Sequence, residues 1–277
     1  MPPGLQRSEL RTSDGVRLSL LGGAPRRAGP ALAERAVPTL VFVPGWCMPA
    51  WLWTAQLEAL APRWPRGSSA STGQRGQGDS QIAAPGTTLD RRADDVHELI
   101  ATLAGPVVLV GWSLGGIEAL HYIHRHGSTR LQGLVLVDSS VGEPPAPPPS
   151  DFAAALRRDR RAAMERFVQA IFARPRPAEE QARLLEAALR LPLETSLALL
   201  DSGLPRTHWR AIVHALACPL AYCITPQYHE QSRHLLAARP ATQVEIFEQA
   251  GHALFVDEAA RFNRFLAGWV DALTVSG

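Results

Sequence analysis

The chain has 277 residues, of which 46% are apolar and 19% charged, a balance typical of a globular protein that buries a sizeable core. Its net charge is only +2, and the 28 basic residues, all arginine, form no basic stripe interleaved with aromatic residues. Nucleic acid is therefore excluded as the expected partner. The length fits one catalytic domain that carries an insertion.

The first 16 residues lack the basic start and the apolar run of a signal peptide, and no later stretch approaches the roughly 18 apolar residues of a transmembrane helix. We therefore expect a cytoplasmic protein that does not enter a membrane. The three cysteines, Cys47, Cys218 and Cys223, form no CxxC pair, which suits a reducing compartment. We assign no disulfide, no metal site and no cofactor.

The N-terminal third alternates strand patterns with helix patterns. Residues 8–21 alternate polar and apolar around Asp14-Gly15, a dipeptide that favours a two-residue hairpin turn with positive φ. The apolar run at 39–43 ends at a Pro-Gly pair and predicts a strand buried on both faces. A helix is expected near 52–62. Residues 65–80 are too polar and too rich in glycine to be assigned as a strand.

The same alternation continues into the middle of the chain. Apolar residues at helical spacing fill 88–105 and stop at a glycine. Two further apolar strands, 106–111 and 131–138, flank a helix that runs to about His126. Strands that alternate with helices predict an α/β fold, with a mostly parallel sheet covered by helices on both faces.

A run of prolines at 143–150 can sustain neither a helix nor a central strand, so it marks a boundary. After it, the pattern over 151–204 is helical only. We interpret residues 144–204 as an inserted helical lid, and residues 1–143 and 205–277 as the core domain. The core pattern resumes with a strand at 218–224, a helix at 229–238, a strand at 242–247 and a helix at 257–273.

The segment Gly111-Trp112-Ser113-Leu114-Gly115 matches the pattern G-x-S-x-G and lies between a buried strand and a helix. A nucleophile at such a sharp turn needs neighbours without a Cβ atom, so that the strained backbone can close. The helix that follows directs its N-terminal amides toward a developing oxyanion. The pattern therefore indicates Ser113 as a nucleophile.

Five segments, FVPGW, RGQGDS, VLVGWSLGG, LVLVDSS and AGHALFVDEAARFNRFL, together resemble the α/β-hydrolase family in content and order. The resemblance implies an α/β-hydrolase fold over nearly the whole chain. It implies Ser113 as nucleophile, His252 as general base, and the N–H groups of Trp46 and Leu114 as the oxyanion hole. Relatives commonly carry His where Pro44 stands here.

The acid that orients the histidine departs from the common pattern of the family. Many members place an Asp in the turn after the strand at 218–224, where this chain has Tyr228. Another branch places it at the end of the preceding strand, which matches Asp138. We favour Asp138. Glu230, or no acid at all, remains the alternative, because an Asp at a strand end can simply cap a turn.

The resemblance implies a serine hydrolase that cleaves a carboxylic ester or lactone of a small apolar substrate through an acyl-enzyme. One alternative is a cofactor-free enzyme similar to the 2,4-dioxygenases that use a His-Asp pair. Those relatives carry histidines on either side of the serine that corresponds to Ser113, whereas Trp112 and Leu114 flank Ser113 in this chain. Another alternative is a non-catalytic ligand receptor on the same fold.

The first half of the lid is rich in arginine, which favours a solvated helix face partly neutralised by Asp159 and Glu165. In lid-bearing esterases that resemble pimeloyl methyl ester esterases, basic lid residues receive an acidic acyl-carrier partner. A docking surface for such a partner is thus the alternative interpretation. The residues concerned are Arg157, Arg158, Arg160, Arg161 and Arg166.

Overall fold

The computed structural model describes residues 5–23, 38–60, 69–83, 87–201 and 203–275. Its strands form one eight-stranded sheet. They are β1 (Leu5–Arg11), β2 (Arg17–Gly23), β3 (Thr39–Val43), β4 (Ser69–Thr72), β5 (Val107–Trp112), β6 (Leu131–Val137), β7 (Leu220–Ile224) and β8 (Gln243–Ile246).

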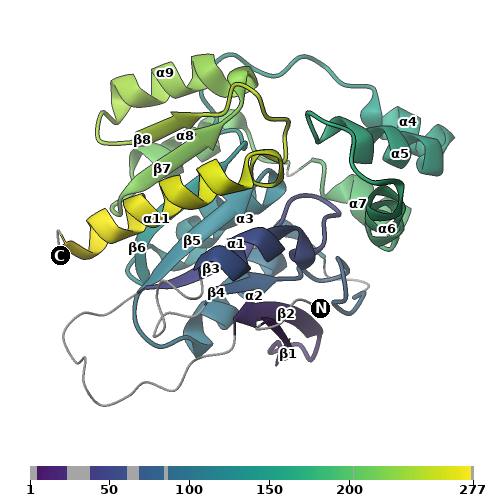
Figure 1. The fold of residues 1–277 in the computed structure, drawn as a ribbon, viewed down its shortest axis with the longest axis horizontal. Coiled ribbons are helices and arrows are strands. Elements are labelled where there is room, and N and C mark those ends of the chain that lie inside the picture. The colour runs from purple at the N-terminus through teal and green to yellow at the C-terminus, as the bar shows by residue number, and fades with distance from the viewer. Residues whose placement is uncertain (1–4, 24–37, 61–68, 84–86, 202, 276–277) are drawn as a thin grey trace.

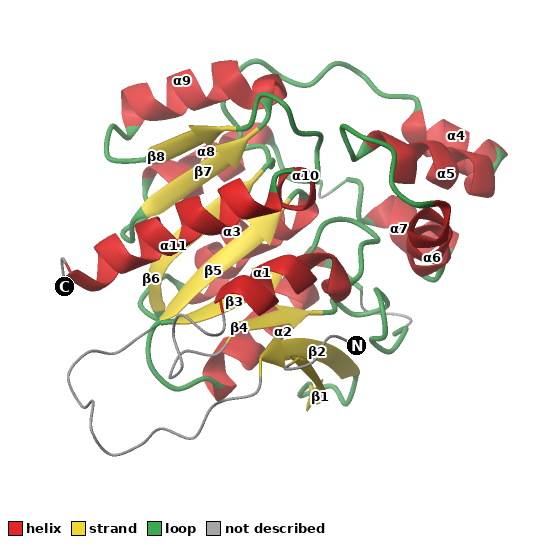
Figure 2. Cartoon of the chain, in the orientation of Figure 1, coloured by secondary structure: helices red, strands yellow, loops and turns green. Residues whose placement is uncertain are grey.

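The strand order is β1-β2-β4-β3-β5-β6-β7-β8. β1 and β2 pair antiparallel, as do β2 and β4, whereas every pairing from β4 to β8 is parallel. Figures 1 and 2 show this sheet running through the molecule with helices on both sides. The predicted α/β architecture with a mostly parallel sheet is confirmed.

Helices alternate with these strands and also fill the segment between β6 and β7. The α-helices are α1 (Thr54–Leu60), α2 (Leu89–Thr102), α3 (Leu114–His126), α4 (Phe152–Arg158), α5 (Arg160–Ala170), α6 (Ala178–Leu189), α7 (Leu193–Ala198), α8 (Arg206–His214), α9 (His229–Ala238), α10 (Leu254–Asp257) and α11 (Ala259–Val275). Two 3-10 helices, η1 (Ala50–Trp53) and η2 (Pro226–Tyr228), complete the described elements. None of the helices in the described ranges is both long and apolar enough to cross a membrane.

The central strands bury both of their faces. On β3, Phe42 packs into the cluster that includes residues of α1 and α11, whereas Val41 packs into the cluster formed with α2, α3 and α8. On β5, Val110 and Leu109 divide in the same way. Successive strand residues point to opposite faces, so a strand covered on both sides must be apolar throughout. This explains the unbroken apolar runs in the sequence.

The predicted hairpin β1–β2 forms, but Thr12 bonds to Val16 across three residues, not the two of the expected turn, and Gly15 adopts a φ of +84° that favours glycine. β4, by contrast, was not predicted. It lies inside the segment 65–80, which is too polar to be assigned as a strand from the sequence. Its backbone pairs with β2 on one side and β3 on the other, and Ser71 is fully buried. Of the predicted 52–62 helix and the 65–80 segment, residues 61–62 and 65–68 lie outside the described ranges.

The helices α4 to α7 form a separate group beyond the carboxyl ends of the parallel strands (Figure 1). Their apolar residues join the core cluster on the α1 and α11 side of the sheet. α8, which follows them, was not predicted from the sequence; its buried residues Trp209 and Val213 pack in the cluster that α3 shares. The group α4 to α7 therefore lies at the carboxyl edge of the sheet, the edge that also carries Ser113, Asp138 and His252.

Candidate active site

Ser113 occupies the sharp turn between β5 and α3. Its φ of 54° and ψ of −120° lie in a region that residues with a side chain rarely adopt. The surrounding hydrogen bonds hold it there: its N–H donates to the Val137 carbonyl at 2.9 Å, and its carbonyl accepts from the Ser139 hydroxyl at 2.8 Å. Ser113 stays partly exposed. A strained, supported backbone that presents a hydroxyl is the geometry that the G-x-S-x-G pattern predicts.

The neighbouring glycines allow three backbones to approach one another. A Cβ atom on Gly111 would collide with the backbone of α3, and one on Gly115 would collide with the carbonyls of Val43 and Pro44. Gly45 also lies close, though with more room, since a Cβ there would come within 3.3 Å of the Cβ of Ser113. The loop after β3 therefore runs directly alongside Ser113.

His252 and Asp138 face each other at the carboxyl edge of the sheet. Nδ1 of His252 lies 2.7 Å from Oδ2 of Asp138. The carboxylate is fully buried, whereas the imidazole is 22% exposed. Asp138 has a φ of 42°, and its N–H donates to the Cys223 carbonyl at 2.8 Å. The structure thus brings together two of the three residues expected from the sequence.

The turn after β7 holds the carboxylate of Asp138 in place. Thr225 donates to Oδ1 through both its N–H, at 2.7 Å, and its hydroxyl, at 2.8 Å, while the Gln227 amide donates to Oδ2 at 2.5 Å. Burial, with a further contribution from nearby Asp138, raises the pKa of Tyr228. Glu230 lies exposed in the first turn of α9. This turn, where many relatives carry their acid, here supplies hydrogen bonds to an acid on the neighbouring strand.

Thr225 and Gln227 were not identified from the sequence. The signal available was the departure of this turn from the usual family pattern, which showed that an acid was missing but not what the turn does instead.

The His252 loop is tied to the residue that precedes Ser113. The indole N–H of Trp112 donates to the His252 carbonyl at 2.8 Å, and the two rings lie 5.3 Å apart, centroid to centroid. The next residue, Ala253, donates its N–H to Ile171 at the end of α5, at 2.7 Å. The histidine loop therefore contacts both the elbow and the helices that follow β6.

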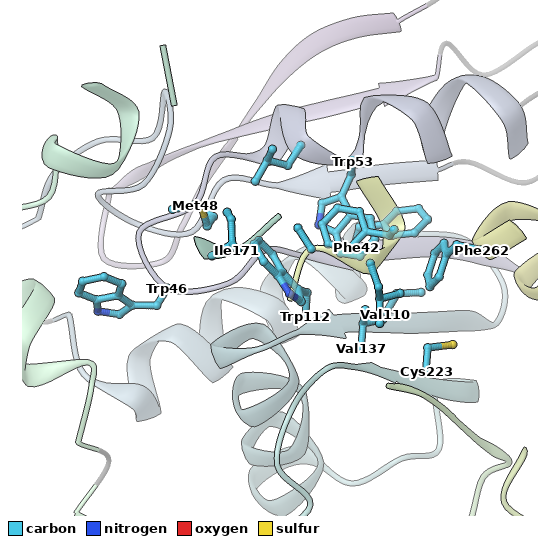
Figure 3. Packing of buried hydrophobic residues seen from close by; sticks show 14 of the residues in the cluster. Phe42, Trp46, Met48, Trp53, Val110, Trp112, Val137, Ile171, Cys223 and Phe262 are labelled. Atoms are coloured by element: carbon cyan, nitrogen blue, oxygen red, sulfur yellow. The ribbon is translucent and has the colours of Figure 1, made fainter. Parts of the chain in front are cut away.

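Trp46, the first of the two expected oxyanion residues, lies in the loop after β3. Its indole N–H donates to the Ser196 carbonyl in α7 at 2.7 Å, and its ring meets those of Phe152 and Phe167 edge-on, at 5.5 and 5.3 Å. Figure 3 shows Trp46 apart from the other labelled side chains, whereas Trp112 lies among them. Leu114, the second, begins α3, where backbone N–H groups have no partner within the helix.

The histidines on α3 do not form a metal centre. His121 contacts Asp90 at 2.5 Å, and His126 contacts Asp94 at 2.8 Å. Within the described ranges, no group of three or more His, Cys, Asp or Glu side chains is arranged to hold a metal ion.

Comparison with protein families decides the identity of this fold. Residues 40–265 match the model of the Alpha/beta hydrolase family. The chain belongs to the alpha/beta hydrolase family. The matched range includes the loop after β3, the turn that carries Ser113 and the loop that carries His252.

Among curated hydrolases, the chain is 30% identical to a pimeloyl-(acyl-carrier protein) methyl ester esterase of Aromatoleum aromaticum, over 79% of this chain and 92% of that protein. It is 36% identical to the non-heme chloroperoxidase CPO-A1 of Kitasatospora aureofaciens, over 101 residues that make up 36% of each chain. The chain thus matches about a third of the length of that relative. An esterase from Exiguobacterium antarcticum shares the fold, with a TM-score of 0.80 at 18% identity over 96% of this chain and all of that one.

Proposed function

We propose that this hydrolase cleaves a carboxylic ester or lactone of a small apolar substrate through an acyl-enzyme on Ser113. The observation that carries the proposal is the buried Asp138 carboxylate, 2.7 Å from Nδ1 of His252, in a loop hydrogen-bonded to the residue beside Ser113. A serine hydroxyl is a weak nucleophile at neutral pH and needs such an oriented base.

The geometry supports the following steps. Asp138 accepts a hydrogen bond from Nδ1–H of His252, which leaves Nε2 unprotonated to take the proton of Ser113. The Ser113 oxygen attacks the carbonyl carbon, and the resulting oxyanion accepts hydrogen bonds from the N–H groups of Trp46 and Leu114. His252 then gives its proton to the departing alcohol oxygen. Water then gives a proton to the same imidazole and attacks the acyl-enzyme. As the bond to Ser113 breaks and the acid leaves, His252 returns that proton to the Ser113 oxygen.

The preference for an apolar substrate rests on aromatic side chains of α4 and α5. Phe152 and Phe167 are half-buried and pack against Trp46, next to the proposed oxyanion hole. Apolar and aromatic walls with a few polar groups are typical of small-molecule sites. We propose that residues 144–204 act as a lid over this site.

A protein-bound acyl group is a second candidate for the substrate. Four arginines of α4 and α5 are exposed, and the relative from Aromatoleum aromaticum is named for an acyl-carrier substrate. Arg160 differs from these four, because its guanidinium donates to the Leu191 carbonyl. The exposed residues are Arg157, Arg158, Arg161 and Arg166.

A fluorophosphonate probe tests the nucleophile. The protein should be labelled and should hydrolyse p-nitrophenyl esters, with rates that depend on acyl chain length, whereas the Ser113→Ala variant should do neither. If the wild-type protein is neither labelled nor active on esters, the serine hydrolase proposal is wrong. Oxygen uptake with hydroxyquinolones would then support the dioxygenase-like alternative, and binding without turnover would support a receptor.

A further inference from the structure

Gln77, in the segment after β4, has a buried side chain that hydrogen-bonds to the loop after β3. Its amide Nε2 donates to the carbonyls of Gly45 and Met48, each at 3.0 Å. Its Oε1 accepts from the N–H of Cys47 at 3.3 Å. Only 1% of Gln77 is exposed. One side chain therefore ties together three backbone groups of the loop that carries Trp46.

The bond to Gly45 has a consequence for the next residue. The carbonyl of Gly45 and the N–H of Trp46 belong to one planar trans peptide, so they point in opposite directions. Gln77, together with the Met48 N–H at 3.1 Å, holds the carbonyl on the buried side of the loop, so the Trp46 N–H must point away from Gln77. Cys47, the following residue, has a φ of +57° without being glycine, so this backbone needs support to keep its shape.

The orientation of the Gln77 amide is itself determined by its surroundings. Arg92 in α2 donates from Nη2 to Oε1 of Gln77 at 2.9 Å. A guanidinium has donors only, so the amide oxygen must face Arg92 and the NH₂ group must face the loop carbonyls. Arg92 is in turn ion-paired through Nε with Glu118 of α3, and both side chains are fully buried.

We propose that Gln77 is the positioning residue of the oxyanion hole, holding the Gly45–Trp46 peptide so that the Trp46 N–H points at the reacting carbonyl, with Arg92 and Glu118 as its anchor. This inference rests on the proposed esterase function. A buried ion pair pays a desolvation cost that apolar packing would avoid, so it is weak evidence for stability by itself. The hydrogen bond from Arg92 to Gln77 gives this ion pair a role in orienting the Gln77 amide.

Gln77→Met tests the inference, because it keeps the approximate length of the side chain and removes its donors. Gln56→Met is the matched control. Gln56 is also fully buried and donates to the Phe255 carbonyl at 2.8 Å and to Asn263 at 3.0 Å, away from the loop after β3. Loss of an oxyanion donor lowers kcat by about 100- to 1000-fold, so a displaced donor should cost roughly 10- to 100-fold.

The effect should fall on kcat, because oxyanion contacts form only in the transition state. For p-nitrophenyl butyrate, Gln77→Met should lower kcat about 10- to 100-fold and change KM less than about threefold. Affinity for a trifluoromethyl ketone, which forms a tetrahedral oxyanion on the serine, should fall by a similar factor. Gln56→Met should keep kcat within about threefold. Equal kcat values in the two variants, or a change confined to KM, would overturn the proposal.

Amide hydrogen exchange of the peptide that covers residues 45–48 provides a readout that needs no activity. Gln77→Met should speed exchange in this peptide relative to the wild-type protein, and Gln56→Met should leave it unchanged. Unchanged exchange in Gln77→Met would overturn the positioning role even if the enzyme is an esterase. Conversely, if the wild-type protein proves inactive on esters, faster exchange would keep Gln77 as the support of this loop, and only the esterase function would fail.

Discussion

Oδ2 of Asp138 lies 2.7 Å from Nδ1 of His252, although 114 positions separate the two residues in the chain. Asp138 directly follows β6, and His252 lies in the loop after β8, two strands away in the sheet. The carboxyl ends of parallel strands meet at one edge, which is where open α/β sheets place their ligands. The topology thus brings together a carboxylate and an imidazole that carry no local signal of their contact.

Replacing Asp138 by Asn should lower kcat for p-nitrophenyl butyrate by about 10³- to 10⁴-fold, because an amide can donate to Nδ1 and stabilise the wrong tautomer of His252. Steady-state kinetics with the purified variants measure this. Glu230→Gln is the matched control and should retain near wild-type kcat, since Glu230 is exposed in α9. The reverse pattern would transfer the role of the acid to Glu230.

Thr225→Val should weaken the support of the Asp138 carboxylate. The variant keeps the shape of the side chain and removes the hydroxyl that donates to Oδ1 at 2.8 Å. A hydrogen bond to a charged group contributes about 1.5–3 kcal/mol, so the free energy of unfolding should fall by that order and kcat should fall about tenfold. Urea unfolding and steady-state kinetics provide the two measurements.

Thr242→Val is the control for this change. Thr242 is also buried, but its hydroxyl has no hydrogen-bond partner in the described part of the chain. Removing an unsatisfied hydroxyl should be neutral or stabilising. If both variants lose the same stability, the Thr225 hydroxyl contributes nothing specific to the acid.

The parts of this fold that were predictable from the sequence are those with a local pattern. β3 and β5 read as strands because sheets covered on both faces require unbroken apolar runs. β4 has no such run, since backbone pairing with β2 and β3 defines it and its residues are serine, alanine and threonine. α8 does have apolar residues at helical spacing, Trp209 and Val213, but it is short and follows α7 closely, so this pattern did not separate it from the preceding helices.

The candidate site divides in the same way. Ser113 stands in a motif whose glycines are themselves the signal, because each permits a close backbone approach. The contact between Asp138 and His252 depends on which loops meet in the folded chain, and no local pattern encodes that contact. Gln77 was part of a segment noted for its resemblance to a family, but its contacts with the loop after β3 depend on burial and on Arg92.

Gly115→Ala should strongly destabilise the protein. A Cβ at this position of α3 would collide with the backbone carbonyls of Val43 and Pro44, which cannot move aside as a flexible side chain could. Overpacking of this kind typically costs about 1–3 kcal/mol, and we expect the upper end of that range because two carbonyls are involved. The variant should show a lower urea midpoint, and its kcat should fall because the strand-to-helix turn must shift.

Gly268→Ala is the matched control, a glycine on the exposed side of α11 where an added Cβ meets no atom within 4 Å. Alanine is the better helix former by about 0.8–1 kcal/mol, so this variant should be slightly more stable than the wild-type protein. Opposite signs for two glycine-to-alanine changes in helices are the expected outcome. Unchanged or increased stability in Gly115→Ala would contradict the close approach at Gly115.

The lowered pKa of His208 should make the stability of the protein depend on pH. Burial lowers its pKa below the ordinary 6.5, and the neighbouring His124 and His121 lower it further. Its ring lies 4.7 Å from that of His124 and 6.3 Å from that of His121, which contacts the carboxylate of Asp90. Nε2 of His208 is buried and, within the described ranges, has no hydrogen-bond partner to stabilise a charged ring.

The sign of the effect follows from this lowered pKa. As the pH falls through 6.5, the unfolded chain binds a proton at His208 before the folded protein does, so the free energy of unfolding should decrease. His208→Gln should reduce this decrease between about pH 7 and pH 5, as urea unfolding at the two pH values would measure. His234→Gln, at an exposed position of α9, is the control and should leave the decrease unchanged. If His208→Gln loses as much stability as the wild-type protein over this pH range, other groups cause the loss. Among them is His97, whose pKa is also lowered by burial.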